Sequence, residues 1–357
     1  ATWLCDCGLG VVVLQLTRHI PAALLTAASS VFIGFFLYRA NHPAVFSVCY
    51  SPWILYAWTR IAGADTVRAS LLWGAALVVA SHAELASGTA KEAYMLLITL
   101  NGTGAMLTLA RREAWRTTLG KLAVAGGAGL VFVMLTAPIW VTFLDALGRS
   151  YTSYNRPAAF QILPTLVLGF FDELFYRPLE IQQRTWNPSV NFLAGVGLLY
   201  ALATIRRVPR DRGFLAVGTG AAIAFSIAFG VVPPQWIARV PFLGNVVHID
   251  NTFSCVLLVH VLVLAGFGYR AAAQRLGTPE GRGDILAVTA LLAILVAAYI
   301  AFTHAVHREP FGPGTVFKVL SWGQRVPLSA FVLTHLLLLP VAAIIMLVLA
   351  RRGLAQG

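Results

Sequence analysis

The chain has 357 residues, of which 58% are hydrophobic and only 11% charged, with a mean hydropathy of +0.77. Soluble domains carry about 25% charged residues, and single cores stop growing near about 250–300 residues, so this composition excludes an ordinary soluble fold. The net charge of +12 comes from short basic clusters between apolar runs, with no basic stripe interleaved with aromatic residues, and this pattern excludes nucleic acid as a partner.

The sequence predicts an all-α, polytopic integral membrane protein with about ten transmembrane helices in a single domain, residues 1–357. A span needs about 20 mainly apolar residues. The ranges that satisfy this are 20–38, 43–59, 69–87, 92–110, 119–142, 190–205, 213–232, 253–270, 284–303 and 327–350. The apolar run 8–17 is too short alone, and we interpret it as the tail of a helix that begins before Ala1 in a truncated or processed chain.

The basic residues predict the orientation of these spans. Most of the 26 Lys and Arg side chains fall in alternate connections, in tight groups such as Arg111, Arg112 and Arg116. Since short cytoplasmic loops carry an excess of Lys and Arg, we expect these groups to face the cytoplasm of a bacterial inner membrane. The longer connections, near 143–189, 233–252 and 304–326, then lie on the outer face.

The first candidate residues in chain order lie near the outer ends of early spans. His42 precedes one span, and His82 and Glu84 end another. An ionised carboxylate at the centre of a bilayer costs about 2.5–3.5 kcal/mol, so a carboxyl group within a span usually faces a cavity or a partner. The bland alternative is a Glu84 that reaches the headgroup region and pairs with Lys91.

The long outer loop, about 143–189, contains an apolar segment near 160–176 that Pro164 and Gly169 interrupt. We predict a re-entrant or interfacial helix there. Asp172 and Glu173 near its end are candidate catalytic carboxylates, able to activate an acceptor hydroxyl or to bind a cation. The alternative is a helix-terminal charge or a solvated turn.

A later candidate is His248, which precedes the span 253–270 together with Asp250. A helix N-terminus at the outer boundary suits a phosphate, but Asp250 opposes this use, and we favour capping of the helix by Asn251 or Thr252. Cys5 and Cys7 fit isolated apolar cysteines better than a metal site. No metal site and no cofactor are predicted, because phosphate-loop, dinucleotide and zinc motifs are all missing from the sequence.

The order of several segments resembles the bacterial YfhO-type membrane proteins, a group with the GT-C glycosyltransferase architecture. The matching segments, spread over most of the chain, are Phe35–Pro43, Ser51–Trp53, Ser81–Glu84, Leu163–Pro164, Val240–Leu243 and Leu264–Gly268. In this family arginines commonly precede the last of these segments. This sequence departs from that pattern, because the corresponding places hold His248 and Thr252.

This resemblance implies a transferase that takes sugar from a polyprenyl-phosphate donor at the outer face of the membrane. Because they share the predicted outer side of the membrane, we take Glu84, Asp172 and Glu173 as candidate catalytic residues and His42, His82 and His248 as candidate substrate-binding residues. The family commonly uses an acidic residue of a first outer loop, which here would precede Ala1.

Two alternatives stay open. A transporter or lipid flippase would use the same cavity without bond chemistry, and a structural subunit of a larger membrane complex would bind other membrane subunits through apolar helix faces. Membrane lipids are expected partners in every case.

Overall fold

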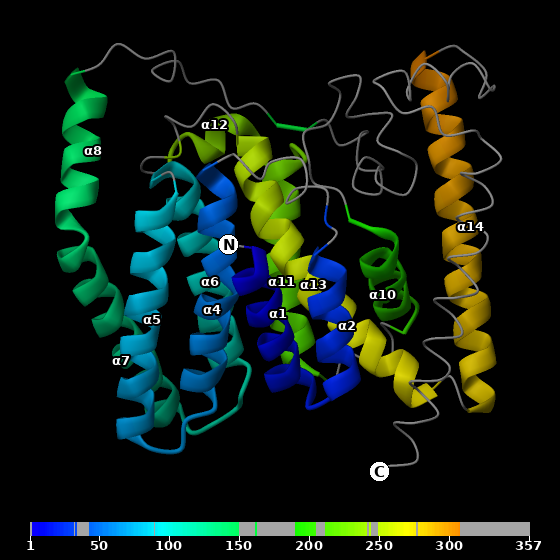
Figure 1. Cartoon of the computed structure of the whole chain (residues 1–357), viewed down its shortest axis with the longest axis horizontal. Helices are drawn as coiled ribbons and strands as arrows, with labels where there is room; N and C mark the ends of the chain where they lie inside the picture. Colours follow the sequence, from blue (N-terminus) through cyan, green and yellow to red (C-terminus); the bar gives the residue numbers. More distant parts are fainter. Residues whose placement is uncertain are drawn as a thin grey trace.

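The computed structural model describes residues 2–31, 33, 43–88, 90–149, 161–162, 190–204, 211–240, 243, 249–275 and 278–307. Within these ranges the regular elements are helical and no strand occurs. The helices, labelled in Figure 1, are α1 (Thr2–Thr17), α2 (Ile20–Val31), α4 (Pro43–Ala62), α5 (Val67–Ser87), α6 (Ala90–Leu109), α7 (Trp115–Leu135), α8 (Ala137–Arg149), α10 (Phe192–Ala203), α11 (Arg212–Ala228), α12 (Pro234–Ile237), α13 (Ile249–Arg275) and α14 (Pro279–His307).

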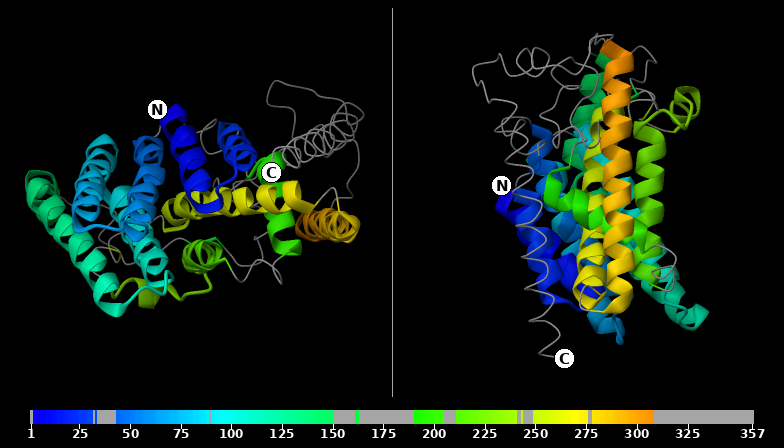
Figure 2. Two further views of the ribbon diagram at one scale, coloured as in Figure 1. Left: turned by 90° about the horizontal axis from the view of Figure 1, so that it is seen from below. Right: turned by 90° about the vertical axis from the view of Figure 1, so that its right-hand side faces the viewer.

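Helix α13 forms the centre of the bundle. It packs against α1, α2, α6, α10 and α11, and Figure 2 shows it crossing the middle of the molecule in the view from below. Residues on every side of it, including Val256, Leu262 and Val263, are buried. A helix that is apolar all round must be enclosed by other apolar elements, and this explains its central place.

Helix α7 lies at the edge of the bundle instead (Figures 1 and 2). It exposes Leu130, Val131, Met134 and Leu135. A contiguous exposed apolar face of this kind marks contact with lipid or with another protein. The structure therefore places apolar side chains both in the core and on the outside, as a bilayer requires.

Three of the described helices are long and apolar enough to cross a membrane, judged by length and composition: Val67–Ser87, Trp115–Leu135 and Phe253–Arg275. For the described part of the chain, the prediction of an all-helical protein is confirmed, and so is the presence of helices long and apolar enough to cross a membrane. The total of about ten spans stays a prediction, and its range 327–350 lies outside the described residues.

Within the described residues, the connections that hold the basic residues predicted to share one side lie at one end of the bundle, the lower end in Figure 1. Lys121 Nζ donates to the carbonyl of Ala62 at 2.8 Å, and Arg212 donates to the carbonyl of Ala110 at 3.0 Å. The first contact joins the end of α4 to the first part of α7, and the second joins the turn after α6 to the start of α11. We call this end, marked by Arg60, Arg111, Arg112, Arg212 and Arg270, the basic end. Its location in the cytoplasm stays a prediction.

Side-chain caps define the starts of several helices. Thr66 accepts a hydrogen bond from the Ala69 N–H at 3.1 Å at the start of α5, and Asn191 accepts from the Ala194 N–H at 2.9 Å at the start of α10. Asp211 accepts from the first amides of α11. Each cap satisfies an N–H group that has no partner within its helix, and so it fixes where the helix begins.

His19 caps α2 in the same way, and this makes the cap sensitive to pH. Its Nδ1 accepts from the Ala22 N–H at 3.1 Å, which only an unprotonated nitrogen can do. Burial lowers the pKa of His19, and the nearby charge of Arg270 lowers it further. In the unfolded chain the pKa of His19 is about 6.5, and above that pH neutral His19 gives its full stabilisation. This stabilisation is lost as the pH falls from there through the lower pKa of His19 in the folded protein.

We expect His19→Asn to reduce the fall in melting temperature between pH 7.5 and pH 5, because asparagine retains a cap acceptor that does not titrate. A cap contributes about 1 kcal/mol, which corresponds to about 2 °C for a protein of this size. Thermal melting of the detergent-purified protein at both pH values measures the difference. An identical pH dependence in wild type and variant would contradict this role of His19.

Three predicted spans differ from the structure in the part of the chain that it describes: α2 ends at Val31 within 20–38, α11 ends at Ala228 within 213–232, and 119–142 is divided. The range 119–142 was expected to be continuous, whereas α7 ends at Leu135 and α8 begins at Ala137. Pro138 follows directly; it has no N–H to donate and its ring crowds the preceding turn, so the helix breaks at Thr136. The re-entrant helix predicted near 160–176 lies outside the described residues, apart from Gln161 and Ile162.

Candidate functional site

Glu84 is the predicted site residue with the most unusual surroundings. It lies one turn before the end of α5, at the end of the bundle opposite the basic end, and none of its side chain is exposed. The hydroxyl of Ser51 on α4 donates to its Oε2 at 3.3 Å. Its Oε1 is buried and has no hydrogen-bond partner. A buried carboxyl oxygen without a partner is costly, and in a native protein it often marks a functional site.

Serines of the two helices hold the backbone around Glu84. The hydroxyls of Ser47 and Ser87 both donate to the Glu84 carbonyl, each at 3.2 Å. Ser47 and Ser51 are four residues apart, so they lie on the same face of α4. This face packs against α5, and the serine side chains therefore form a polar strip between two otherwise apolar helices.

The other predicted site residues do not join Glu84 within the described part of the chain. His82 is two residues away on α5, which places it on a different side of the helix, and its side chain is exposed. The predicted residues that lie outside the described ranges are His42, Asp172, Glu173 and His248.

A second buried polar contact lies at the centre of the bundle and was missed by the sequence interpretation. His260 of α13 is completely buried. Its Nδ1 lies 2.8 Å from the Val256 carbonyl, so this nitrogen carries the proton of the neutral ring. Nε2 lies 2.8 Å from Thr103 Oγ1 of α6, and because that hydroxyl also lies 2.9 Å from the Thr99 carbonyl, its single proton serves two acceptors. The available signal was a histidine in the middle of an apolar span.

Gly220 of α11 makes room for this pair. A Cβ atom at Gly220 would lie 2.3 Å from Thr103 Oγ1 and 2.6 Å from His260 Nε2, which is too close for any side chain. Three helices therefore meet at one histidine, and its two ring nitrogens are both occupied. This arrangement fits a structural tie between α6, α11 and α13 better than a binding site.

Asp6 forms a third buried contact that the sequence interpretation missed. It is 7% exposed, and Ser30 of α2 donates to its Oδ1 at 2.6 Å. Cys5 beside it is buried and its thiol points to the carbonyl of Val48 on α4, with an S–O distance of 3.8 Å. Asp6 and Cys5 thus connect α1 to α2 and α4.

The chemistry available at these contacts is proton transfer and hydrogen bonding. No group of three or more His, Cys, Asp or Glu side chains that suits a metal ion occurs in the part of the chain that the structure describes. Among the residues at the centre of these three contacts, Glu84, His260 and Asp6, only Glu84 has a buried oxygen without a hydrogen-bond partner, and this oxygen could take up a proton. No protein-family model, no curated protein and no solved structure matches this chain, so the geometry at Glu84 is the starting point for its function.

Proposed function

We propose that this protein is a GT-C-like glycosyltransferase of a bacterial inner membrane, which transfers sugar from a polyprenyl-phosphate donor at the end of the bundle opposite the basic end. The observation that carries the proposal is the fully buried Glu84 carboxyl group, whose Oε1 has no partner. The resemblance of the segment Ser81–Glu84 to the YfhO-type proteins supports it.

The proposed reaction uses Glu84 as a general base. The acceptor hydroxyl attacks the anomeric carbon of the donor sugar, the bond from that carbon to the phosphate oxygen breaks, and the hydroxyl proton passes to the carboxylate. Ser51, which donates to Oε2, leaves Oε1 available for this proton. The step requires α4 and α5 to separate enough to admit the acceptor, since Glu84 is enclosed between them.

The remaining predicted residues have supporting roles in this proposal. Asp172 and Glu173 supply further carboxylates for the acceptor or for a cation, and His42, His82 and His248 bind the donor. His82 is exposed next to Glu84 in the sequence, which suits contact with a donor that approaches from the lipid.

The proposal is tested with purified protein in lipid vesicles and a panel of synthetic polyprenyl-phosphate hexoses and pentoses, with an extract of membrane glycans as the acceptor. We expect Glu84→Gln to reduce the release of polyprenyl phosphate at least about 100-fold, the usual contribution of a general base. Mass spectrometry measures the released lipid phosphate. The variant should remain folded, because a neutral amide is less costly to bury than a carboxylate.

Asp65→Asn is the matched control, since Asp65 is an exposed carboxylate at the basic end, before α5. It should leave the release of polyprenyl phosphate unchanged. Wild-type rates in both Glu84→Gln and Asp172→Asn would remove these carboxylates from the mechanism and the proposal with them.

A transporter or flippase is the second candidate, and the enclosure of Glu84 between two helices favours it. A buried carboxyl group that is reached only when helices separate is suited to binding a proton in alternating access. The same vesicles distinguish the two functions: a transporter moves the labelled lipid or solute across the bilayer with its sugar–phosphate bond intact.

A further inference from the structure

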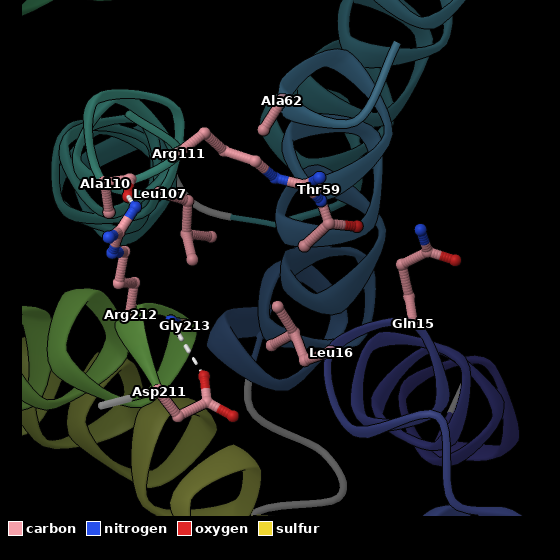
Figure 3. A pocket seen from close by; sticks show the side chains of 10 residues that line it. All are labelled: Gln15, Leu16, Thr59, Ala62, Leu107, Ala110, Arg111, Asp211, Arg212 and Gly213. Carbon is pink, nitrogen blue, oxygen red and sulfur yellow. Dashed lines mark hydrogen bonds between the residues drawn. The ribbon is translucent and has the colours of Figure 1, made fainter. Parts of the chain in front are cut away.

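The bundle contains a pocket of about 370 Å³ at its basic end, away from Glu84. It lies between α1, α4, the turn after α6 and the start of α11 (Figure 3). Its polar lining includes Gln15, Thr59, Arg111, Asp211 and Arg212. Figure 3 shows the side chain of Arg111 extending towards Thr59, while that of Arg212 extends towards Ala110.

The charges around this pocket leave a positive excess. Asp211 caps α11 by accepting from the Gly213 and Phe214 amides, and it also pairs with Arg270 at 3.2 Å. The negative charge of Asp211 is therefore already matched outside the pocket. Arg111 and Arg212 are left without a carboxylate partner among the described residues, so the pocket carries the charge of two guanidinium groups.

The donors of these two arginines are also partly unused. Arg212 donates from Nη1 to the Ala110 carbonyl at 3.0 Å, which fixes its direction and leaves its other N–H groups available. A Cβ atom at Gly63 would lie 3.1 Å from Nη2 of Arg111, so the absence of a side chain at Gly63 lets this guanidinium reach across to α4. Two planar guanidinium groups of this kind are suited to the oxygens of a phosphate.

Part of the pocket wall is apolar. Leu16, Ala62 and Leu107 line it beside the polar residues. A free inorganic anion would gain nothing from these side chains, whereas the glycerol and first acyl carbons of a lipid would bury apolar surface against them. The pocket also lies at the ends of helices, where lipid headgroups meet a membrane protein.

We propose that this pocket binds the phosphate of an anionic phospholipid headgroup. Arg111 and Arg212 hold the phosphate oxygens, the Gln15 amide donates to the headgroup, and the apolar part of the wall encloses the glycerol region. The site goes beyond the proposed function: it lies at the opposite end of the bundle and requires no chemistry at Glu84.

The experiment titrates detergent-purified full-length protein with phosphatidylglycerol and, separately, with phosphatidylcholine, and it follows the melting temperature. A ligand that binds only the folded state raises the melting temperature in proportion to its occupancy. We expect phosphatidylglycerol to stabilise the protein and phosphatidylcholine to have little effect. In Arg111→Gln the apparent Kd for phosphatidylglycerol should rise at least about tenfold.

Arg68→Gln is the matched control, because Arg68 is an exposed arginine at the same end that does not line the pocket. Its apparent Kd should stay within about twofold of wild type. Arg111 is preferred to Arg212 for the test, since Arg212 anchors the Ala110 carbonyl and its loss would disturb the fold. Arg111→Lys keeps the charge and should restore part of the affinity.

Three results would overturn the proposal. Equal stabilisation by both lipids would remove the requirement for an anionic headgroup. Equal weakening in Arg68→Gln and Arg111→Gln would show general surface attraction in place of a site. Stabilisation by inorganic phosphate at the same concentrations as the lipid, lost in Arg111→Gln, would identify a soluble phosphate as the ligand. Loss of glycan transfer in Glu84→Gln has no bearing on any of them.

Discussion

Gly268→Ala is expected to prevent α13 from packing against α10 and to leave little folded protein. A Cβ atom at Gly268 would lie 1.9 Å from the Gly197 carbonyl oxygen and 2.9 Å from the Ala201 nitrogen. Both neighbours are backbone atoms, so no side chain can rotate away and one helix has to move. Small residues of this kind let two helix backbones approach closely within a membrane.

The expected cost is more than about 4 kcal/mol, in the range that only severe core disruption reaches. It is measured as the yield of monodisperse protein after detergent extraction, together with the melting temperature of what remains. Because α13 is the centre of the bundle and also packs against α1, α2, α6 and α11, its displacement should affect the whole fold.

Gly126→Ala is the control for this prediction. Gly126 also lies within a helix, α7, but a Cβ atom there would have nothing within 4 Å. The substitution should be neutral or slightly stabilising, since alanine has the higher helix propensity. Normal yield and melting temperature for Gly268→Ala would mean that α10 and α13 do not approach as closely as described.

Much of the helical framework could be predicted from hydropathy alone. The predicted ranges 43–59, 69–87 and 92–110 correspond to α4, α5 and α6 with small differences at their ends. The alternating direction of these three helices was also predictable, because the described basic residues between and after them lie in short connections at one end of the bundle. Length, apolar composition and charge are local properties of a sequence, and they determine these features.

The faces of the helices were less predictable. The stretch 123–129 is rich in small residues, which commonly allow close helix packing in a membrane, yet Gly126, Gly127 and Gly129 have nothing within 4 Å of a Cβ position. Ala125 and Ala128 are the buried residues of this stretch. In a membrane protein both faces of a helix are apolar, so hydropathy does not distinguish the face that meets lipid from the face that meets α5.

The candidate site shows what one span can and cannot predict. A carboxylate within a span indicated a Glu84 that faces a cavity or a partner; in the structure Glu84 is buried, Ser51 donates to its Oε2 and its Oε1 has no partner. The alternative of pairing with Lys91 depended on an exposed carboxyl group, which Glu84 is not. His82 was grouped with it because of sequence proximity, whereas two residues along a helix turn a side chain to a different side.

The role of His260 could not be predicted, because the sequence around it does not indicate which residues of other helices it contacts. Its partners, Thr103 and Gly220, lie far away in the sequence on two other helices. No spacing rule connects such residues, since their proximity depends on how the helices pack. Lys121 was likewise assigned to the set of orientation signals, although the structure buries it.

The buried Lys121 leads to the second large expected effect. Its ammonium group is 2.6 Å from Glu113 Oε2 and 2.8 Å from the Ala62 carbonyl, and its side chain is 5% exposed while that of Glu113 is 30% exposed. We expect Glu113→Ala to cost about 3 kcal/mol, because it leaves a buried cation without its counter-charge. Lys121→Met should cost clearly less, since the carboxylate left behind can be hydrated.

The double variant separates the two contributions. If the cost of Glu113→Ala comes from the stranded charge, adding Lys121→Met should recover most of it, with a melting temperature several degrees above that of Glu113→Ala alone. Asp145→Ala serves as the control, because its pair with Arg149 is exposed and should contribute nothing measurable. Simple addition of the two single costs in the double variant would mean that Lys121 and Glu113 act independently, and that the contact between them does not join α7 to the turn before it.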